Sequence, residues 1–193
     1  MNAILPQEQA GSDLPAGYPL DYIETVTLRD GLQVILRPIR PDDAPRLQEG
    51  FNRLSQRSVY LRFLESFRQL PDEQAENFAR LDYANRMALV VEIQEHSEPH
   101  LIGVARYALI GPDAPGLAES AVVVVDEFQG KGLGTLLLDR LVKHARTHGV
   151  YAFTATVHIS NTQIMRFIKK SGLRSEKKML EPGVWEIHIY LSA

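Results

Sequence analysis

The clearest apolar run near the middle of the chain is a row of four valines, Val122 to Val125. β-branched residues favour strands, and a run of this length is short for a helix, so we expect a buried strand. After it, apolar residues recur at the spacing of one helix face, up to a closing Gly149. These apolar positions are Leu133, Leu136, Leu137, Leu141 and Ala145. A glycine-rich turn, 129–134, separates strand and helix.

The residues before this unit predict two hairpins with helices between them. The expected strands are 22–28 and 32–37, joined by Arg29-Asp30-Gly31, and 87–93 and 101–109, joined by the polar stretch 94–100. The expected helices begin near Asp42 or Asp43, with Leu47 and Phe51 facing inward, and then cover 56–64 and 72–81. Proline and acidic residues at 71–73 are typical of a helix start.

The residues after Gly149 predict a strand at 151–158, a helix opened by Asn161, and a hairpin of 174–180 and 184–191 around Glu181-Pro182-Gly183. Strands alternating with helices in this order indicate an α/β fold with a mixed sheet. We expect residues 1–20 to form a flexible N-terminal tail, since they lack apolar periodicity. Residues 21–193 then form a single domain.

Composition narrows the possible functions. The 193 residues are 45% hydrophobic and 23% charged, as in an ordinary globular protein, with 24 acidic against 21 basic residues and a net charge of −3. No basic tract suggests a nucleic-acid partner, and no apolar run approaches the ~20 residues that span a bilayer. No signal peptide is recognisable. The absence of cysteine excludes disulfides, thiolate metal sites and a cysteine nucleophile. We therefore expect a cytoplasmic protein.

Metal binding is not expected. The six histidines include no HExxH pattern. His144 and His148 are one helical turn apart, but we place both on the polar side of a solvated helix, where chelation is the rarer outcome.

The turn after the central strand is suited to an anion. Glycines at a helix N-terminus leave backbone N–H groups uncovered, and the helix dipole favours negative charge. Lys131 and Thr135 add a cation and a hydroxyl. The turn is not a P-loop, because no Gly-Lys-Ser/Thr follows it, and Gln129 stands where a dinucleotide fingerprint has its first glycine. The pattern alone leaves phosphate binding and an ordinary glycine turn both open.

Gln129-Gly130-Lys131-Gly132-Leu133-Gly134 after a valine-rich strand resembles the Gln/Arg-x-x-Gly-x-Gly/Ala signature of the GNAT N-acetyltransferase superfamily. The helix from Asn161 to Ser171-Gly172-Leu173 is similar to that family's second motif. The resemblance implies a GNAT fold, with a mixed, mostly antiparallel sheet flanked by helices. It also implies acetyl-CoA as cofactor, with its pyrophosphate on the amides of 129–135.

A finer likeness covers the N-terminal half. The stretches LRDGLQVILRPIRPDDAPRLQEGFNRLSQRSVYLRF and LDYANRMALVVE resemble the acetyltransferase domain of bacterial Pat-type protein lysine acetyltransferases. That domain is often fused to regulatory or acyl-CoA-synthetase-like domains, for which 193 residues leave no room. The likeness implies that the acceptor is a lysine of a protein partner.

Acetyl transfer also needs a group that takes the proton of the ammonium, and support for an oxyanion. Glu119 is our candidate base: it begins the central strand on the same face as Ala121 and Val123, where the resemblance places the family's glutamate. A solvated residue at the start of the strand is the alternative. A backbone N–H near Val124 or Val125 would support the oxyanion if a bulge exposes it.

The remaining cofactor contacts follow from the resemblance. Separation of the central strand from the 151–158 strand would open a slot for the pantetheine arm, lined by Val123, Val124 and Val125. Asn161 is an N-cap on its residue type, and the family's matching Asn also touches the pantetheine. Ile168 stands where the family usually has a tyrosine that protonates the leaving thiolate, so no hydroxyl is available there.

We therefore expect an acetyl-CoA-dependent N-acetyltransferase that acts by direct attack in a ternary complex, most simply on a protein lysine. Acetylation of a small amine is the first alternative. A non-catalytic acyl-CoA-binding module is the second, favoured by the missing tyrosine, and an oligomeric scaffold is the third. The oligomeric state is not indicated by the sequence.

Overall fold

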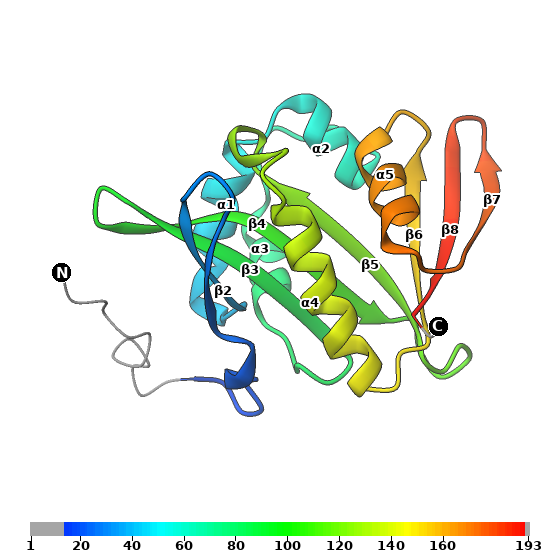
Figure 1. The fold of residues 1–193 in the computed structure, drawn as a ribbon, viewed down its shortest axis with the longest axis horizontal. Coiled ribbons are helices and arrows are strands. Elements are labelled where there is room, and N and C mark those ends of the chain that lie inside the picture. Colours follow the sequence, from blue (N-terminus) through cyan, green and yellow to red (C-terminus); the bar gives the residue numbers. More distant parts are fainter. Residues whose placement is uncertain (1–13, 192–193) are drawn as a thin grey trace.

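The computed structural model describes residues 14–191, and its centre is one eight-stranded sheet (Figure 1). The strands lie side by side in the order β1-β2-β3-β4-β5-β6-β8-β7. Every neighbouring pair is antiparallel except β5 and β6. The strands are β1 Glu24–Thr27, β2 Gln33–Pro38, β3 Arg86–Glu95, β4 Glu98–Leu109, β5 Leu117–Val124, β6 Ala152–His158, β7 Ser175–Glu181 and β8 Val184–Tyr190. The expected mixed, mostly antiparallel sheet is confirmed.

Helices cover both faces of this sheet. They are α1 Ala44–Asn52, α2 Gln56–Phe63, α3 Asp72–Ala79, α4 Leu133–Thr147 and α5 Thr162–Ser171. Helices α4 and α5 lie on the face turned to the viewer in Figure 1, with α1 and α3 behind. Each face has its own buried apolar cluster, one under α4 and one under α1 and α3. This is the α/β layering that the alternation of elements predicted.

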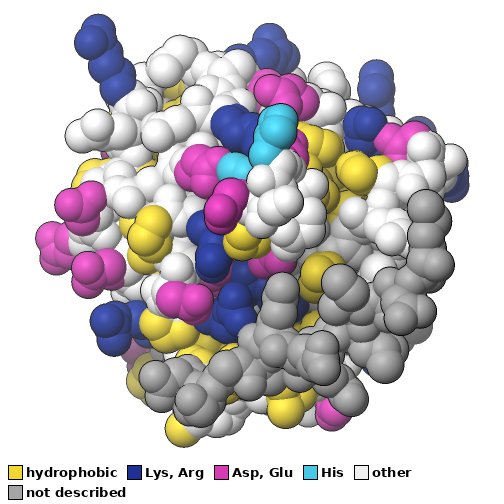
Figure 2. Space-filling model, turned by 90° about the vertical axis from the view of Figure 1, so that its left-hand side faces the viewer, with side chains coloured by type: hydrophobic (Ala, Val, Ile, Leu, Met, Phe, Trp, Pro, Cys, Tyr) yellow, Lys and Arg dark blue, Asp and Glu magenta, His cyan; other side chains and the backbone are white. Residues whose placement is uncertain are grey.

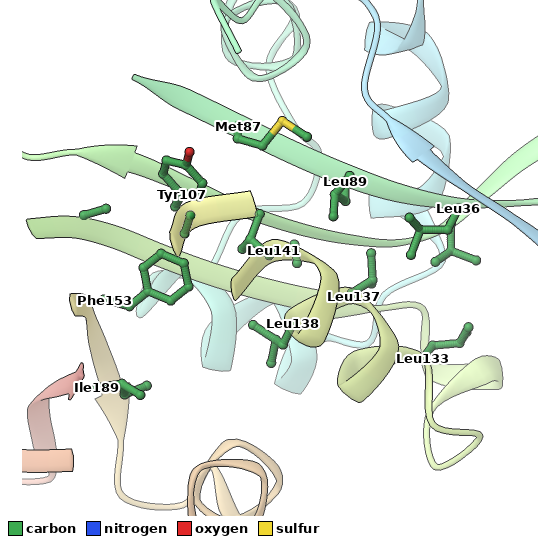
Figure 3. Close-up of a cluster of buried hydrophobic side chains, with 14 of the residues drawn as sticks. Leu36, Met87, Leu89, Tyr107, Leu133, Leu137, Leu138, Leu141, Phe153 and Ile189 are labelled. Carbon is green, nitrogen blue, oxygen red and sulfur yellow. The ribbon is translucent and has the colours of Figure 1, made fainter. Parts of the chain in front are cut away.

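Helix α4 is held by a row of leucines. Leu133, Leu137 and Leu141 are at most 1% exposed and point into the sheet, where they meet side chains of β2, β3 and β4 (Figure 3). Burying a leucine contributes roughly 1.5–3 kcal/mol, so this face anchors the helix firmly. The N-terminus of α4 is thereby fixed next to the end of β5.

Several boundaries differ from the sequence-based expectation. Strands β3 and β4 run longer than expected, and only His96 and Ser97, with φ of 52° and 70°, make the turn between them. The central strand covers Leu117–Val124, so it begins two residues before the expected start at Glu119 and ends before Val125. Strand β8 lies between β6 and β7, so the last hairpin enters the sheet by its second strand. Polar and small residues at these strand ends interrupt the apolar periodicity from which strands are predicted.

One expectation about α4 is wrong. His144, expected on the polar side, is 1% exposed and packs edge-on against Tyr22. Its Nδ1 lies 3.0 Å from the Tyr107 hydroxyl, and its ring stacks on His148 at 3.9 Å. Burial, and then the neighbouring His148, lower the pKa of His144 to about 4. Among residues 14–191 no group of three or more His, Cys, Asp or Glu side chains has the arrangement of a metal site.

The N-terminal boundary also has a structural feature. Residues 1–13 of the expected tail lie outside the described residues. Tyr18, within that tail, donates from its hydroxyl to the Pro38 carbonyl at 2.8 Å and packs edge-on against Tyr83. Packing against the domain thus begins before residue 21.

The surface is mixed in charge. Figure 2, viewed from the left of Figure 1, shows Lys and Arg interspersed with Asp and Glu, without a continuous basic area among the described residues of that face. Within the part of the chain that the structure covers, no helix is both long and apolar enough to cross a bilayer.

A buried ion cluster joins β2, β3 and the start of α1. Arg37 donates to both oxygens of Asp43, at 2.7 and 2.8 Å, and to Glu92 at 2.7 Å. The Asp43 carboxylate also accepts the Arg40 N–H at 2.8 Å. Burial alone would raise the pKa of Asp43, but the hydrogen bonds from Arg37 outweigh it and the pKa lies below its usual value.

This cluster leads to a stability prediction. Asp43→Asn leaves a buried guanidinium underpaired and should lower the free energy of unfolding at pH 7 by about 3–5 kcal/mol. Because the folded-state pKa of Asp43 is depressed, its stabilisation is present above the unfolded pKa of about 3.9 and is lost as pH falls through the folded value. Urea unfolding at pH 7 and in the acid range measures both effects.

The control is Asp42→Asn, whose side chain is 65% exposed and forms only long ion pairs. It should cost less than about 1 kcal/mol. If Asp42→Asn and Asp43→Asn lowered the free energy of unfolding equally, the buried ion cluster would not contribute the predicted stability.

Candidate active site

The site begins where β5 and β6 separate. Their parallel ladder contains only three pairs, the last being Glu119 with Thr154. Beyond this pair β6 continues alongside β8, while β5 continues alongside β4 (Figure 1). The two central strands therefore diverge beyond Glu119 and Thr154.

The divergence leaves backbone groups of β5 without a strand partner. Val125 N–H donates to Ile102 and Leu117 accepts from Ile110, so the odd-numbered residues of β5 bond to β4. Backbone hydrogen-bonding groups alternate in direction along an antiparallel ladder. The backbone N–H and C=O groups of the even-numbered residues Val122 and Val124 therefore point towards the side from which β6 has separated. The β4–β5 register is regular, without the bulge considered above. This alternation alone directs the Val124 N–H into the opening, whereas the Val125 N–H points to β4.

The glycine turn leads from this opening into α4. Gly130 and Gly132 have φ of 77° and 93°, in the left-handed region that favours glycine. A Cβ added at Gly130, Gly132 or Gly134 would meet no protein atom within 4 Å, so the space in front of the turn is open. Gly132 is the N-cap of α4 and supplies no side-chain cap.

The first-turn N–H groups of α4, at Leu133, Gly134 and Thr135, lack intrahelical partners. Thr135 is exposed, while the Leu133 side chain is buried and can offer only its backbone. Lys131 is also exposed, and its Nζ lies 2.5 Å from Asp30 in the β1–β2 turn. A cation and several free N–H groups therefore border the same open space.

Gln129 holds the open end of β5 in place. Its amide nitrogen donates to the Val124 carbonyl at 3.0 Å and to Ser58 of α2 at 3.2 Å. Its amide oxygen accepts from Gln163 of α5 at 3.0 Å. Ser58 and Ser55 in turn donate to Asp126. Gln129 thus connects β5, α2 and α5, and its side chain is a positioning group at this edge.

Glu119 is exposed on the opposite face of β5 from α4. Its cross-strand partner is Ala108, and the next pair on the same face is Ala121 with Arg106 of β4. A cavity of about 60 Å³ lies along this face, bounded by Ala121, Val123, Arg106 and Arg62 of α2. Glu119 therefore lies on the same face of β5 as Ala121 and Val123, which line this mainly apolar cavity.

A family model described as Acetyltransferase (GNAT) family matches residues 55–173. The chain belongs to this family. The matched segment contains the diverging strands and the glycine turn.

Relatives and solved structures agree with this assignment. An acetyltransferase of Pseudomonas aeruginosa is 33% identical over 123 residues, 64% of this chain and 65% of that protein. The acetyltransferase Pat of Mycolicibacterium smegmatis is 31% identical over 147 residues, 76% of this chain and 43% of that protein. The crystal structure of the GNAT domain of S. lividans PAT has a TM-score of 0.80 and 29% identity, covering 90% of this chain and 99% of that domain. The match spans less than two thirds of either curated relative.

The second GNAT motif lies on α5. Asn161 caps this helix, since its side-chain oxygen accepts the Ile164 N–H at 3.2 Å. The amide nitrogen of Asn161 has no hydrogen-bond partner among the described residues, so the cap and a cofactor contact are compatible. Ile168, at the position of the family's tyrosine, is 6% exposed and belongs to the core.

Two polar residues just before β3, Asp82 and Tyr83, have structural hydrogen-bond partners. The Tyr83 hydroxyl donates to the Ile39 carbonyl at 2.8 Å, and the side chain is 4% exposed. The Asp82 carboxylate accepts the N–H groups of Ala84, Asn85 and Arg86. Neither faces the opening between β5 and β6.

Helix α2 also contributes to this region, although its residues were not predicted to do so. Ser55 and Ser58 bind Asp126, and Tyr60 packs edge-on against His158 of β6 at 5.4 Å. Helix α2 therefore borders both diverging strands. Its serines and tyrosine carry no recognisable motif, and only the long-range packing shows their role.

The turn leads to a binding prediction. In Gly132→Ala the added Cβ projects into the space in front of the α4 N-terminus, so the dissociation constant for acetyl-CoA should rise about tenfold, or 1.4 kcal/mol. Isothermal titration calorimetry measures it.

Gly149→Ala is the matched control. Gly149 follows the other end of α4, has φ of 76°, and its added Cβ would also meet open space. Both variants carry the same backbone strain, of about 1–2 kcal/mol. If Gly149→Ala weakened binding equally, the turn would have no special part in it.

Proposed function

We propose that this chain transfers an acetyl group from acetyl-CoA to the side-chain amine of a protein lysine, by direct attack in a ternary complex. The observation that carries the proposal is the opening beside β5. It places the unpaired N–H groups of Val122 and Val124 next to the uncovered amides of residues 130–135. A ligand with an amide-bearing arm and a diphosphate would match both sets of donors.

The residues present fit acetyl-CoA. The turn is open where added Cβ atoms would project, which leaves room for phosphate oxygens to approach the amides. Lys131 adds a positive charge there, and Asn161 at the start of α5 has an amide nitrogen without a hydrogen-bond partner among residues 14–191. In the proposal, Val123 and Val125 shape the acceptor face by their side chains, and Val124 contributes its N–H.

When bound, acetyl-CoA supplies the thioester that the amine attacks. Glu119 accepts the proton that the attacking ammonium must lose, directly or through one water. The Val124 N–H donates to the acyl oxygen as negative charge develops on it. A backbone donor needs no reorientation during the reaction, because the β4–β5 ladder holds it.

The described part of the chain offers no acid for a leaving thiolate, whose proton would therefore come from solvent. Ile168 offers no hydroxyl, and Tyr83 is bonded elsewhere in the core. Thiols have pKa values of about 8.5, so a thiolate can leave without a dedicated acid. The isoleucine is therefore compatible with turnover, and the non-catalytic alternative is not required by its presence.

The acceptor assignment rests on the resemblance to Pat-type protein lysine acetyltransferases in the N-terminal half. Calorimetric titration with acetyl-CoA tests binding first. Thiol release in the presence of lysine peptides, polyamines and free amino acids then tests the acceptor. Binding without turnover of any amine would support the acyl-CoA-binding module instead, and turnover of small amines alone would overturn the protein substrate.

Glu119→Gln tests the proposed base. The amide cannot take a proton, so kcat/KM for the acetylated acceptor should fall about 10²- to 10⁴-fold, with little change in acetyl-CoA affinity. Steady-state thiol release and calorimetry measure the two quantities.

Glu98→Gln, at an exposed residue of the β3–β4 hairpin, is the control and should retain wild-type kinetics. A Glu119→Gln protein with native circular dichroism and an undiminished rate would remove Glu119 from the mechanism.

A further inference from the structure

Two arginines border the acceptor cavity beside Glu119. Arg62, in the last turn of α2, and Arg106, on β4, both line the cavity formed with Ala121 and Val123 of β5. They come from segments far apart in the sequence and face the same small space. The proposed transfer of an acetyl group gives these two arginines no role.

Neither arginine has a carboxylate partner within 4 Å among residues 14–191. Arg106 donates to the Phe78 carbonyl at 3.2 Å and stacks over the Phe78 ring at 4.2 Å. Arg62 stacks over the ring of its neighbour Phe63 at 4.6 Å. By contrast, Arg37 and Arg53 each bind two carboxylates. Both cavity arginines are only partly exposed, so they are not merely solvated surface groups.

The environment disfavours this concentration of positive charge. Burial lowers the pKa of Arg62 to about 10, against a partial opposing effect of Glu119. Burial, followed by the positive charges of Arg62 and Arg86, lowers the pKa of Arg106 to about 9. An anion entering the cavity would offset this repulsion and accept hydrogen bonds from both guanidinium groups.

The location relative to Glu119 indicates which molecule brings the anion. Arg106 is opposite Ala121, and Glu119 is opposite Ala108, so Arg106 and Glu119 are diagonal neighbours on one face, about 7–8 Å apart along the strands. An amine that reaches Glu119 therefore lies near Arg106, and Arg62 is close enough to Glu119 for that carboxylate to act on its charge. The diphosphate donors lie elsewhere, at the N-terminus of α4, on the opposite face.

We propose that Arg62 and Arg106 form a carboxylate-binding subsite for the acceptor, so that this enzyme prefers amines that carry a carboxylate close by. For a protein acceptor, this means an aspartate or glutamate beside the target lysine. The same chemistry would be met by the α-carboxylate of a free amino acid. The kinetic test of this inference rests on the proposed acetyl transfer, whereas the binding test does not depend on turnover.

The kinetic test compares two peptides that differ only at the residue before lysine, acetyl-Ala-Glu-Lys-Ala-amide and acetyl-Ala-Gln-Lys-Ala-amide. For the wild-type enzyme, the KM of the glutamine peptide should exceed that of the glutamate peptide about tenfold at low salt, as expected for a charge-assisted hydrogen bond. The ratio should decrease as salt screens the interaction. Free glycine and its amide form a second arm, which identifies an amino acid as the source of the carboxylate.

Substitutions locate the effect. Arg62→Gln and Arg106→Gln should each bring the ratio of KM values towards one, while Arg62→Lys should retain part of it. The matched control is Arg57→Gln, which removes the same charge from an exposed position on α2 and should keep the wild-type ratio. Circular dichroism of each variant reports whether the fold is intact.

Three results would overturn the subsite: equal KM values for both members of each wild-type pair, a preference for the uncharged member, or the same loss in Arg57→Gln as in Arg62→Gln. If no amine is turned over, the proposed function fails, and NMR titration of the two peptides into the protein decides the subsite independently. Tighter binding of the glutamate peptide that depends on Arg62 and Arg106 would then still support it, and equal binding would reject it.

Discussion

The early end of the β5–β6 ladder, at Glu119 and Thr154, is the constraint on which the site depends. Buried or half-buried backbone N–H groups are costly to leave unpaired, so a sheet normally closes such an opening. Here β6 is paired with β8 on its other side, and Gln129 and α2 border the end of β5. The strands are therefore held apart by other parts of the fold, and the free donors remain available to a ligand.

In the proposed reaction β5 serves both ligands, because its free backbone donors and its odd-numbered side chains point in different directions. Backbone donors of even-numbered β5 residues face the opening, whereas the side chains of Ala121 and Val123 border the cavity on the face of β5 that also carries Glu119. Acyl donor and amine acceptor can thus approach from different directions and meet at one strand. Direct transfer needs this arrangement, since the chain has no cysteine for a thioester intermediate on the enzyme.

The residues that stabilise the fold differ from those proposed to bind the cofactor. The leucines of α4 and the Arg37–Asp43–Glu92 cluster hold the layers together, far more tightly than an exposed turn could. The glycines of the turn contribute little packing, and the open space in front of them is where the proposed cofactor would bind. Substitutions in the turn should therefore change ligand affinity more than the free energy of unfolding. Substitutions in the core should change the free energy of unfolding more than the affinity.

Local sequence was sufficient for much of this protein. The valine run, the glycine turn, the α4 periodicity and the Asn161 cap depend on neighbours in the chain, and the structure has each element close to its expected position. The motif order was enough to indicate the GNAT family. These features follow from periodicity, propensity and backbone freedom, which act over a few residues.

Contacts between distant segments settled the rest. The insertion of β8 beside β6, the burial of His144 against Tyr107, and the meeting of Arg62 with Arg106 at one cavity have no signal in the neighbouring residues. Which backbone donors of β5 stay free also depends on where β6 turns away. Such outcomes are set by how whole elements pack, because burial and pairing are properties of the assembled sheet.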